Sequence, residues 1–214
     1  LREFGAKGDG ETDDTKAIQE AIDKYDNIYV PQGWYRITET LKMKPDTKLI
    51  GLHPFGTQFR LDESTAAFSG FGGPKAMVES SEGGANMLVG IGINTGGYNY
   101  RAVGVKWMAN ADSYMNDVKF VGGHGGLWKP KPGVEEPRGR WNRPARISSP
   151  DNPVAASGMD LAWDNQYWSL WVTNNGGGTF KDIWTASTYA TNGFYANNTS
   201  TPGRIYAMSI EHHV

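Results

Sequence analysis

The sequence contains no cysteine, which excludes disulfide bonds, thiolate metal sites and a cysteine nucleophile. It is also poor in charge. Only 21% of its 214 residues are charged and the formal net charge is −2, so there is no electrostatic basis for binding nucleic acid or an anionic membrane. No apolar run approaches the roughly 20 residues that cross a bilayer. We therefore expect neither a nucleic acid nor a membrane as a partner.

Glycine and aromatic residues are abundant instead. The chain has 28 Gly and 8 Trp, and 12% of its residues are aromatic. Many turn-forming residues with few long helical stretches indicate an all-β protein. The opening residues 1–4 lack the charged and apolar regions of a signal peptide, so any location must be inferred from function.

Residues 13–25 carry the one convincing helical pattern. The preceding Thr and Asp cluster offers N-cap oxygens and places acidic side chains at the positive end of the helix dipole. The apolar residues that recur at helical spacing are Ala17, Ile18, Ala21, Ile22 and Tyr25. We predict a short amphipathic helix that buries one face.

Short strand-like segments follow, each bounded by Gly or Asn. Successive segments are often separated by roughly 15–25 residues, the scale of one solenoid coil. We predict a single domain of stacked coils over residues 1–214. Its expected parts are an N-terminal cap and first coil (1–50), a long inserted loop rich in proline (122–158) and further coils (159–214).

Residues 4–18, 28–33 and 35–37 resemble the N-terminal cap of pectate-lyase-superfamily β-helix proteins. Residues 174–185 and 201–214 resemble segments of glycoside hydrolase family 55-like proteins, which are exo-β-1,3-glucanase-like. The resemblance implies a right-handed parallel β-helix whose short helix caps the exposed first coil. It also implies that the chain is the N-terminal portion of a larger protein. We expect a second chain or a C-terminal remainder to complete the β-helix.

The function implied by this resemblance is that of a glycoside hydrolase acting on a β-glucan such as β-1,3-glucan. Hydrolysis of this kind uses carboxylates as general acid and base, and we expect no cofactor. One alternative is a polysaccharide lyase of the pectate-lyase superfamily. Another is a non-catalytic carbohydrate-binding or tailspike-like β-helix subunit. The expected partner is a polysaccharide or oligosaccharide, and the expected location is secreted, periplasmic or at the cell surface.

Asp160, Asp164 and Glu211 are the candidate catalytic carboxylates. In an extended segment Asp160 and Asp164 share one face about 13 Å apart, which is longer than the separation of a retaining pair. Unless the chain bends between them, one of the two would act with a carboxylate elsewhere. The alternative reading is that both are turn or surface residues.

Aromatic and histidine side chains are the candidate substrate-binding groups. Trp163 and Trp168 lie among polar residues, so we predict that they stack on sugar rings, whereas Trp184 lies within a strand pattern and is expected in the core. His212 and His213 adjoin Glu211 and could bond sugar hydroxyls, or form a satisfied polar patch between coils. No third ligand lies at an informative spacing, so we predict no metal site.

Overall fold

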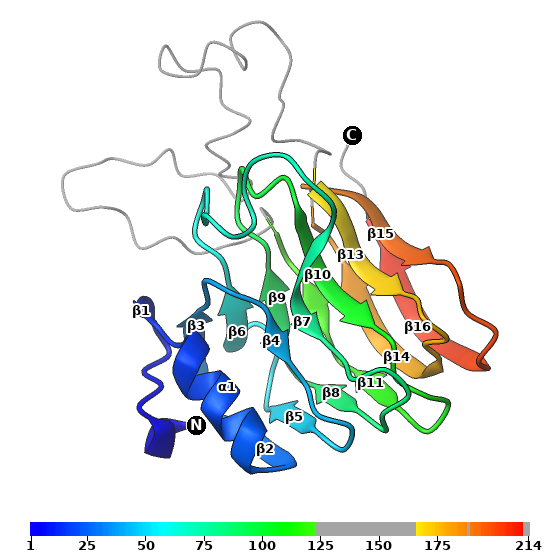
Figure 1. Ribbon diagram of the computed structural model, residues 1–214, viewed down its shortest axis with the longest axis horizontal. Coiled ribbons are helices and arrows are strands. Elements are labelled where there is room, and N and C mark those ends of the chain that lie inside the picture. The colour runs from blue at the N-terminus through cyan, green and yellow to red at the C-terminus, as the bar shows by residue number, and fades with distance from the viewer. Residues whose placement is uncertain (123–165, 188, 212–214) are drawn as a thin grey trace, which may run out of the picture.

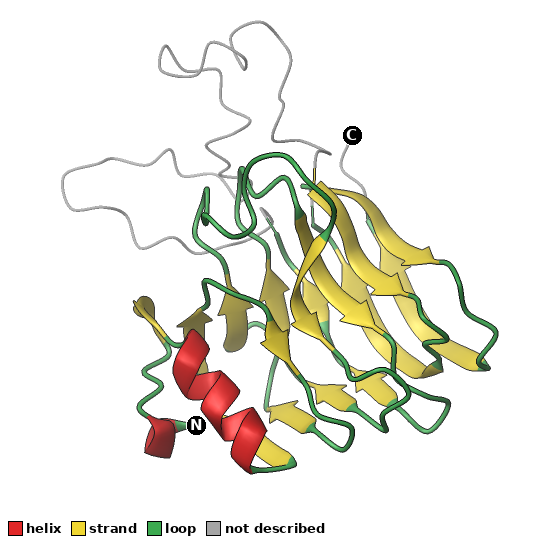
Figure 2. Ribbon diagram, in the orientation of Figure 1, coloured by secondary structure: helices red, strands yellow, loops and turns green. Residues whose placement is uncertain are grey.

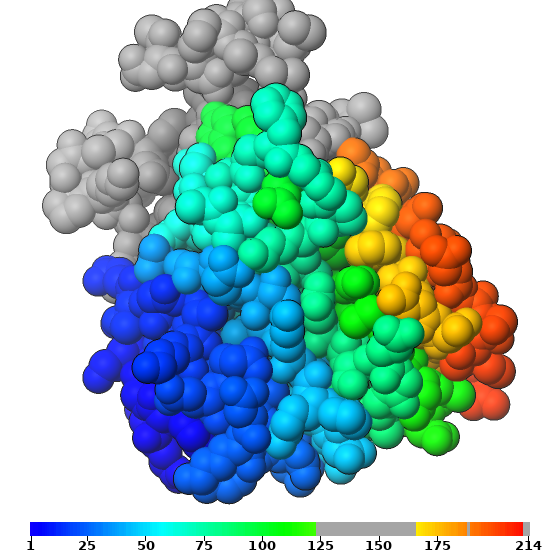
Figure 3. Space-filling view, viewed as in Figure 1, coloured from blue at the N-terminus to red at the C-terminus, as the bar shows by residue number. Residues whose placement is uncertain are grey.

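The structure is a computed structural model that describes residues 1–122, 166–187 and 189–211. Within these ranges it is almost entirely β, with a 3-10 helix η1 (Arg2–Phe4) and one α-helix, α1 (Thr15–Lys24). The helix lies at one end of a series of strands (Figure 2), and successive parts of the chain follow one another from that end to the other (Figure 3). No helix in the described ranges is long and apolar enough to cross a membrane.

Three parallel ladders run through the strands (Figure 1). The first joins β2 (Asn27–Val30), β5 (Lys48–Gly51), β8 (Met87–Val89), β11 (Tyr114–Asn116), β14 (Gly178–Thr185) and β16 (Gly203–Ile210). The second joins β1 (Asp9–Asp13), β3 (Gly33–Arg36), β6 (Thr57–Arg60), β9 (Gly92–Asn94), β12 (Lys119–Phe120) and the end of β14. The third joins β4 (Leu41–Lys42), β7 (Lys75–Glu79), β10 (Ala102–Trp107), β13 (Gln166–Val172) and β15 (Ala190–Ala196).

Each ladder takes one strand from each successive turn of the chain, and every pairing is parallel. The chain therefore winds into stacked coils, which confirms the predicted parallel β-helix. The predicted spacing between successive strands of a ladder is observed from β2 to β5 but is exceeded from β5 to β8. The extra length is a long segment between the end of β6 at Arg60 and the start of β7 at Lys75.

The core consists of inward-facing apolar columns, one for each ladder. In the first column Leu49 pairs with Leu88, and in the second Phe59 pairs with Ile93; all four side chains are fully buried. The third column contains Leu41, Val78, Val105, Leu170 and Phe194 in register. Each apolar side chain thus packs on its equivalent in the neighbouring coil, which removes these columns from water.

In four of the coils the corner between the first ladder and the second contains one left-handed residue. The residue that follows Val89, Asn116, Lys181 or Tyr206 in these paired strands adopts positive φ. These corner residues are Gly90 (φ 65), Asp117 (φ 50), Asp182 (φ 52) and Ala207 (φ 57). Glycine and aspartate tolerate this left-handed conformation better than alanine, so Ala207 is the strained member of the column.

Helix α1 covers the first coil with its apolar face, which buries Ile18, Ala21 and Ile22. Its polar side chain Gln19 reaches the open edge of β4. Gln19 Oε1 accepts the backbone N–H of Lys42 at 2.8 Å and its Nε2 donates to the Lys42 carbonyl at 3.0 Å. The side-chain amide thus takes the place of a neighbouring strand. The buried apolar face confirms the predicted capping helix, whereas its N-cap residue Asp14 makes no side-chain capping hydrogen bond and instead accepts the backbone N–H groups of Lys7 and Gly8.

Replacing Ala207 by Gly is expected to stabilise the β16 end of the protein by about 0.5–1 kcal/mol, because glycine relieves the left-handed strain at some cost in unfolded-state entropy. Hydrogen exchange of the β16 amides and urea unfolding measure the effect. Ala196→Gly is the matched control, since Ala196 is an exposed strand residue whose φ is not positive, and it should destabilise the protein. Equal effects of the two substitutions would contradict the assignment of strain to Ala207.

Candidate functional site

A row of residues, one from each of five neighbouring coils, lies on the outer surface of the second ladder. In register order it consists of Trp34, Gln58, Gly92, Lys119 and Trp184. The strand neighbours Phe59 and Phe120 are fully buried, so the row points away from the core. The coils thus bring side chains that are far apart in the sequence onto one surface.

The segment that precedes β6 lies over the middle of this row. A Cβ atom on Gly92 would lie 2.2 Å from the carbonyl oxygen of Pro54, so only glycine fits beneath this segment. The ring of Phe55 packs edge-on against Trp184 with 5.7 Å between centroids, and His53 packs against Phe55 at the same distance. Phe55 is 46% exposed, so Phe55 and Trp184 form an accessible aromatic pair.

Glu211 lies beside this aromatic pair. The ring N–H of Trp184 donates a hydrogen bond to Glu211 Oε1 at 2.8 Å. The backbone N–H of Glu211 donates to the Thr185 carbonyl at 2.8 Å, which continues the ladder one residue beyond β16. The side chain is exposed. Of the candidate carboxylates, Glu211 is therefore the one that the structure places next to an aromatic surface, and its catalytic role stays a prediction.

The core position expected for Trp184 is wrong. Trp184 is half-buried and pairs with Lys119 on the outer surface. The left-handed residue Asp182 interrupts the alternation of β14, so Ile183 and Thr185 are buried and Trp184 points outward. A strand pattern read as continuous across residues 180–184 therefore assigns Trp184 to the wrong face.

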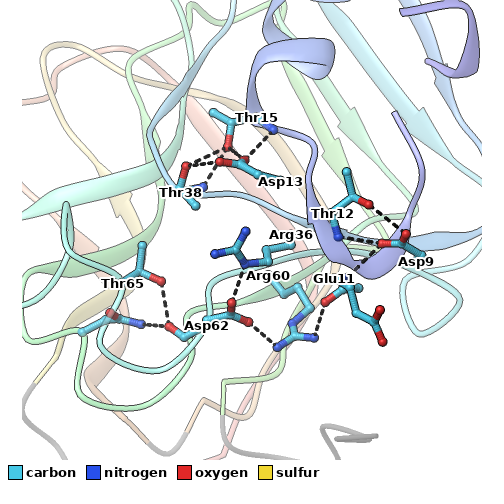
Figure 4. Close-up of polar contacts among 12 residues, drawn as sticks. Asp9, Glu11, Thr12, Asp13, Thr15, Arg36, Thr38, Arg60, Asp62 and Thr65 are labelled. Carbon is cyan, nitrogen blue, oxygen red and sulfur yellow. Dashed lines mark hydrogen bonds and ion pairs between the residues drawn. The ribbon is translucent and has the colours of Figure 1, made fainter. Parts of the chain in front are cut away.

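A polar cluster lies at the other end of the same surface, where β1, β3 and β6 meet (Figure 4). Asp62 forms ion pairs with the Nε atom of Arg36 and with Nη2 of Arg60, the latter at 2.7 Å. Arg60 also donates to the Gly10 carbonyl at 3.1 Å, and burial lowers its pKa while Asp62 opposes this. The Arg36 guanidinium remains partly exposed at the surface.

Asp13 lies close to this cluster and is held by threonines. Its Oδ1 accepts the Thr15 hydroxyl at 2.5 Å and the Thr15 backbone N–H at 3.0 Å, and its Oδ2 accepts the Thr38 hydroxyl at 2.7 Å. Burial acts to raise the pKa of Asp13, but these hydrogen bonds and the charge of Arg36 outweigh it, and the net pKa is lowered. Asp13 is therefore ionised at neutral pH and is a poor proton donor.

Trp168 lies on a different surface, the outer face of β13 and β15. Its ring stacks on Tyr195 with 4.1 Å between centroids and 19° between planes. It also packs in a tilted arrangement against Trp171, with 4.9 Å between the ring centroids. Lys106 Nζ lies 5.1 Å from the centroid of Trp171. Trp168 is half-buried in this aromatic cluster, and its proposed contact with sugar stays a prediction.

The remaining predicted site residues lie outside the described ranges. They are Asp160, Trp163, Asp164, His212 and His213. Among the residues that the structure does describe, no group of three or more His, Cys, Asp or Glu side chains gathers as a metal site would require.

Phe55, Arg36 and Arg60 were not identified from the sequence. Phe55 lies in an irregular segment, and only the coil register shows that it reaches Trp184. Arg36 and Arg60 are equivalent residues of neighbouring coils. In the sequence each follows a buried aromatic residue, Tyr35 or Phe59, at the end of a strand, and this shared pattern could have identified them.

Gly92→Ala is expected to destabilise the protein by about 1–3 kcal/mol, because the added methyl group meets the Pro54 carbonyl and must displace the segment that carries Phe55. Urea unfolding followed by tryptophan fluorescence reports both stability and the environment of Trp184. Gly73→Ala is the matched control, since a Cβ there has no neighbour within 4 Å. A Gly92→Ala protein as stable as the control would contradict the close approach.

Comparisons with known proteins give short sequence matches and partial structural likeness. The chain is 46% identical over 54 residues to a probable glucan endo-1,3-beta-glucosidase of Arthroderma benhamiae, a stretch that is 24% of this chain and 6% of that protein. It is 51% identical over 43 residues to alginate lyase 7 of Azotobacter vinelandii, or 18% of this chain and 5% of that protein. The matches thus span only a small part of these relatives.

Among solved structures, the A-module of a mannuronan C-5 epimerase of Azotobacter vinelandii aligns with 98% of this chain and 52% of its own, at a TM-score of 0.41 and 18% identity. The ORF18 protein of Geobacillus virus E2 aligns with 92% of this chain and 40% of its own, at a TM-score of 0.45 and 19% identity.

A family model covers far more of the sequence than these individual matches. The model described as rhamnogalacturonase A/epimerase, pectate lyase-like, matches residues 1–204. This range includes all the described coils up to the start of β16. The chain therefore belongs to the rhamnogalacturonase A/epimerase, pectate-lyase-like family of polysaccharide-active β-helix proteins.

Proposed function

We propose that the chain forms part of a glycoside hydrolase that degrades a β-glucan such as β-1,3-glucan. The observation that carries the proposal is the hydrogen bond from the Trp184 ring to the Glu211 carboxylate, which holds an acidic group beside the exposed ring of Phe55. Aromatic rings pack on the C–H faces of sugars, and a neighbouring carboxylate accepts their hydroxyl groups or takes part in acid–base chemistry. The 46% identical stretch of a probable glucanase supports the choice of substrate.

Glu211 needs a partner carboxyl group for hydrolysis. Asp13 is a poor candidate because both of its carboxylate oxygens already accept hydrogen bonds from Thr15 and Thr38. Asp62 is already paired with two arginines. Asp160 and Asp164 therefore remain the proposed partners within this sequence.

We also propose that the protein is secreted or lies at the cell surface, because a polymeric substrate cannot enter a cell.

A polysaccharide lyase is the second candidate. The stretch that is 51% identical to an alginate lyase favours it, as does the exposed part of Arg36. A guanidinium at this surface could neutralise the carboxylate of a uronate sugar, which a lyase requires before the adjacent proton is abstracted.

A third candidate is a carbohydrate-binding subunit without catalysis, because a similar stretch occurs in a preneck appendage protein of Bacillus phage PZA.

Product analysis with the full polypeptide distinguishes these activities. We expect β-1,3-glucan to yield new reducing ends without ultraviolet-absorbing products, because hydrolysis leaves no double bond. An unsaturated product from alginate or another polyuronate would show a lyase. Saturable binding of a glucan without any product would favour the binding subunit.

Glu211→Gln is expected to lower kcat on the glucan by at least about 10²-fold, because the amide cannot exchange a proton, while substrate binding persists. Steady-state kinetics and calorimetric titration measure the two quantities. Glu20→Gln, an exposed change on α1, is the matched control and should keep full activity. Unchanged turnover in Glu211→Gln would move the catalytic site away from this surface.

A further inference from the structure

The turn between β15 and β16 contains two overlapping Asn-X-Ser/Thr sequences. Residues 197–199 read Asn-Asn-Thr and residues 198–200 read Asn-Thr-Ser. This is the acceptor pattern for N-linked glycosylation and needs a surface segment of a secreted protein. The structure meets the surface requirement, since Asn198, Thr199 and Ser200 are exposed and Asn197 is half-buried.

The two asparagines differ in how the fold holds them. The ring N–H of Trp171 donates to Asn197 Oδ1 at 2.8 Å, which fixes the side chain through its oxygen. The Nδ2 atom of Asn197 makes no hydrogen bond to the described part of the chain and is the atom that a glycan would modify. Asn198 instead lies at the corner of the turn with positive φ (48°), and its carbonyl accepts the backbone N–H of Asn175.

Asn197 also adjoins the aromatic cluster on the outer face of β13 and β15, which includes Trp168. Tyr195 precedes it by two residues in the extended chain, so both side chains point outward. Tyr195 stacks on Trp168, and Trp171 lies against Trp168 at 4.9 Å. All three rings are half-buried, and Trp171 contacts the Asn197 amide directly.

We propose that Asn197 is an acceptor for an N-linked glycan, occupied when the chain passes through an N-glycosylating secretory pathway, and that the first sugar packs on the rings of Tyr195 and Trp171. In this reaction Asn197 Nδ2 forms a bond to the anomeric carbon of a lipid-diphosphate-linked oligosaccharide. The bond from that carbon to the diphosphate oxygen breaks, the lipid diphosphate leaves, and the amide loses one proton to the transferase. The oxygen atom of the side chain stays available to the Trp171 N–H.

The site is tested by secreting the full chain from a eukaryotic cell line and mapping the glycan by mass spectrometry after peptide N-glycosidase treatment in heavy-oxygen water. Asn197→Gln and Thr199→Ala each remove the first sequon, and the glycan on residue 197 should be lost. Asn198→Gln and Ser200→Ala each remove only the second sequon and should leave occupancy unchanged. A glycan on Asn198, or none on the wild-type chain, would overturn the proposal.

The aromatic contact is tested by comparing the glycosylated protein with its enzymatically trimmed form, which keeps a single sugar on Asn197, and with unglycosylated protein made in bacteria. The single sugar should raise Tm by on the order of 2 °C relative to the unglycosylated protein. In Tyr195→Ser this rise should disappear even though occupancy persists. A rise of the same size in Tyr195→Ser and wild type would show that the sugar does not pack on the ring.

Discussion

The parallel hydrogen-bond ladder between coils determines where each side chain of this protein lies. Because a parallel ladder keeps equivalent residues in register, Phe59 packs on Ile93 inside and Gln58 lies beside Gly92 outside. A shift of strand register in one coil would therefore misalign every column of stacked side chains that includes this coil. The left-handed corner at Gly90 and its equivalents is therefore a structural requirement, because it sets the angle between the first two ladders in those four coils.

The same register assembles the proposed site from distant parts of the sequence. Phe55 comes from the second coil and Trp184 from β14, yet their rings are in contact. Glu211 is placed by the ladder bond to Thr185 and then oriented by the Trp184 ring. The two acids at the opposite end of this surface, Asp13 and Asp62, are already bonded to threonines and arginines, so they support the strands and leave proton transfer to other groups.

The features that the sequence predicts well are those with a local signal. The apolar spacing of Ile18, Ala21 and Ile22 predicts α1, and the resemblance of the cap segments predicts the β-helix. The placement of Trp184 failed because positive φ at Asp182 reverses the facing of the residues after it, and aspartate carries no clear signal of that conformation. Contacts such as Phe55 with Trp184 depend on which strands pair, and a degenerate coil repeat with insertions does not reveal that pairing.

The contact between Gln19 and the backbone of Lys42 has a consequence for self-association. An open parallel edge is a template on which another strand can add, as in fibril growth. At β4 both backbone groups of Lys42 are already occupied by one side-chain amide. Helix α1 therefore blocks the addition of a further strand, and with it templated fibril growth, at the edge of β4.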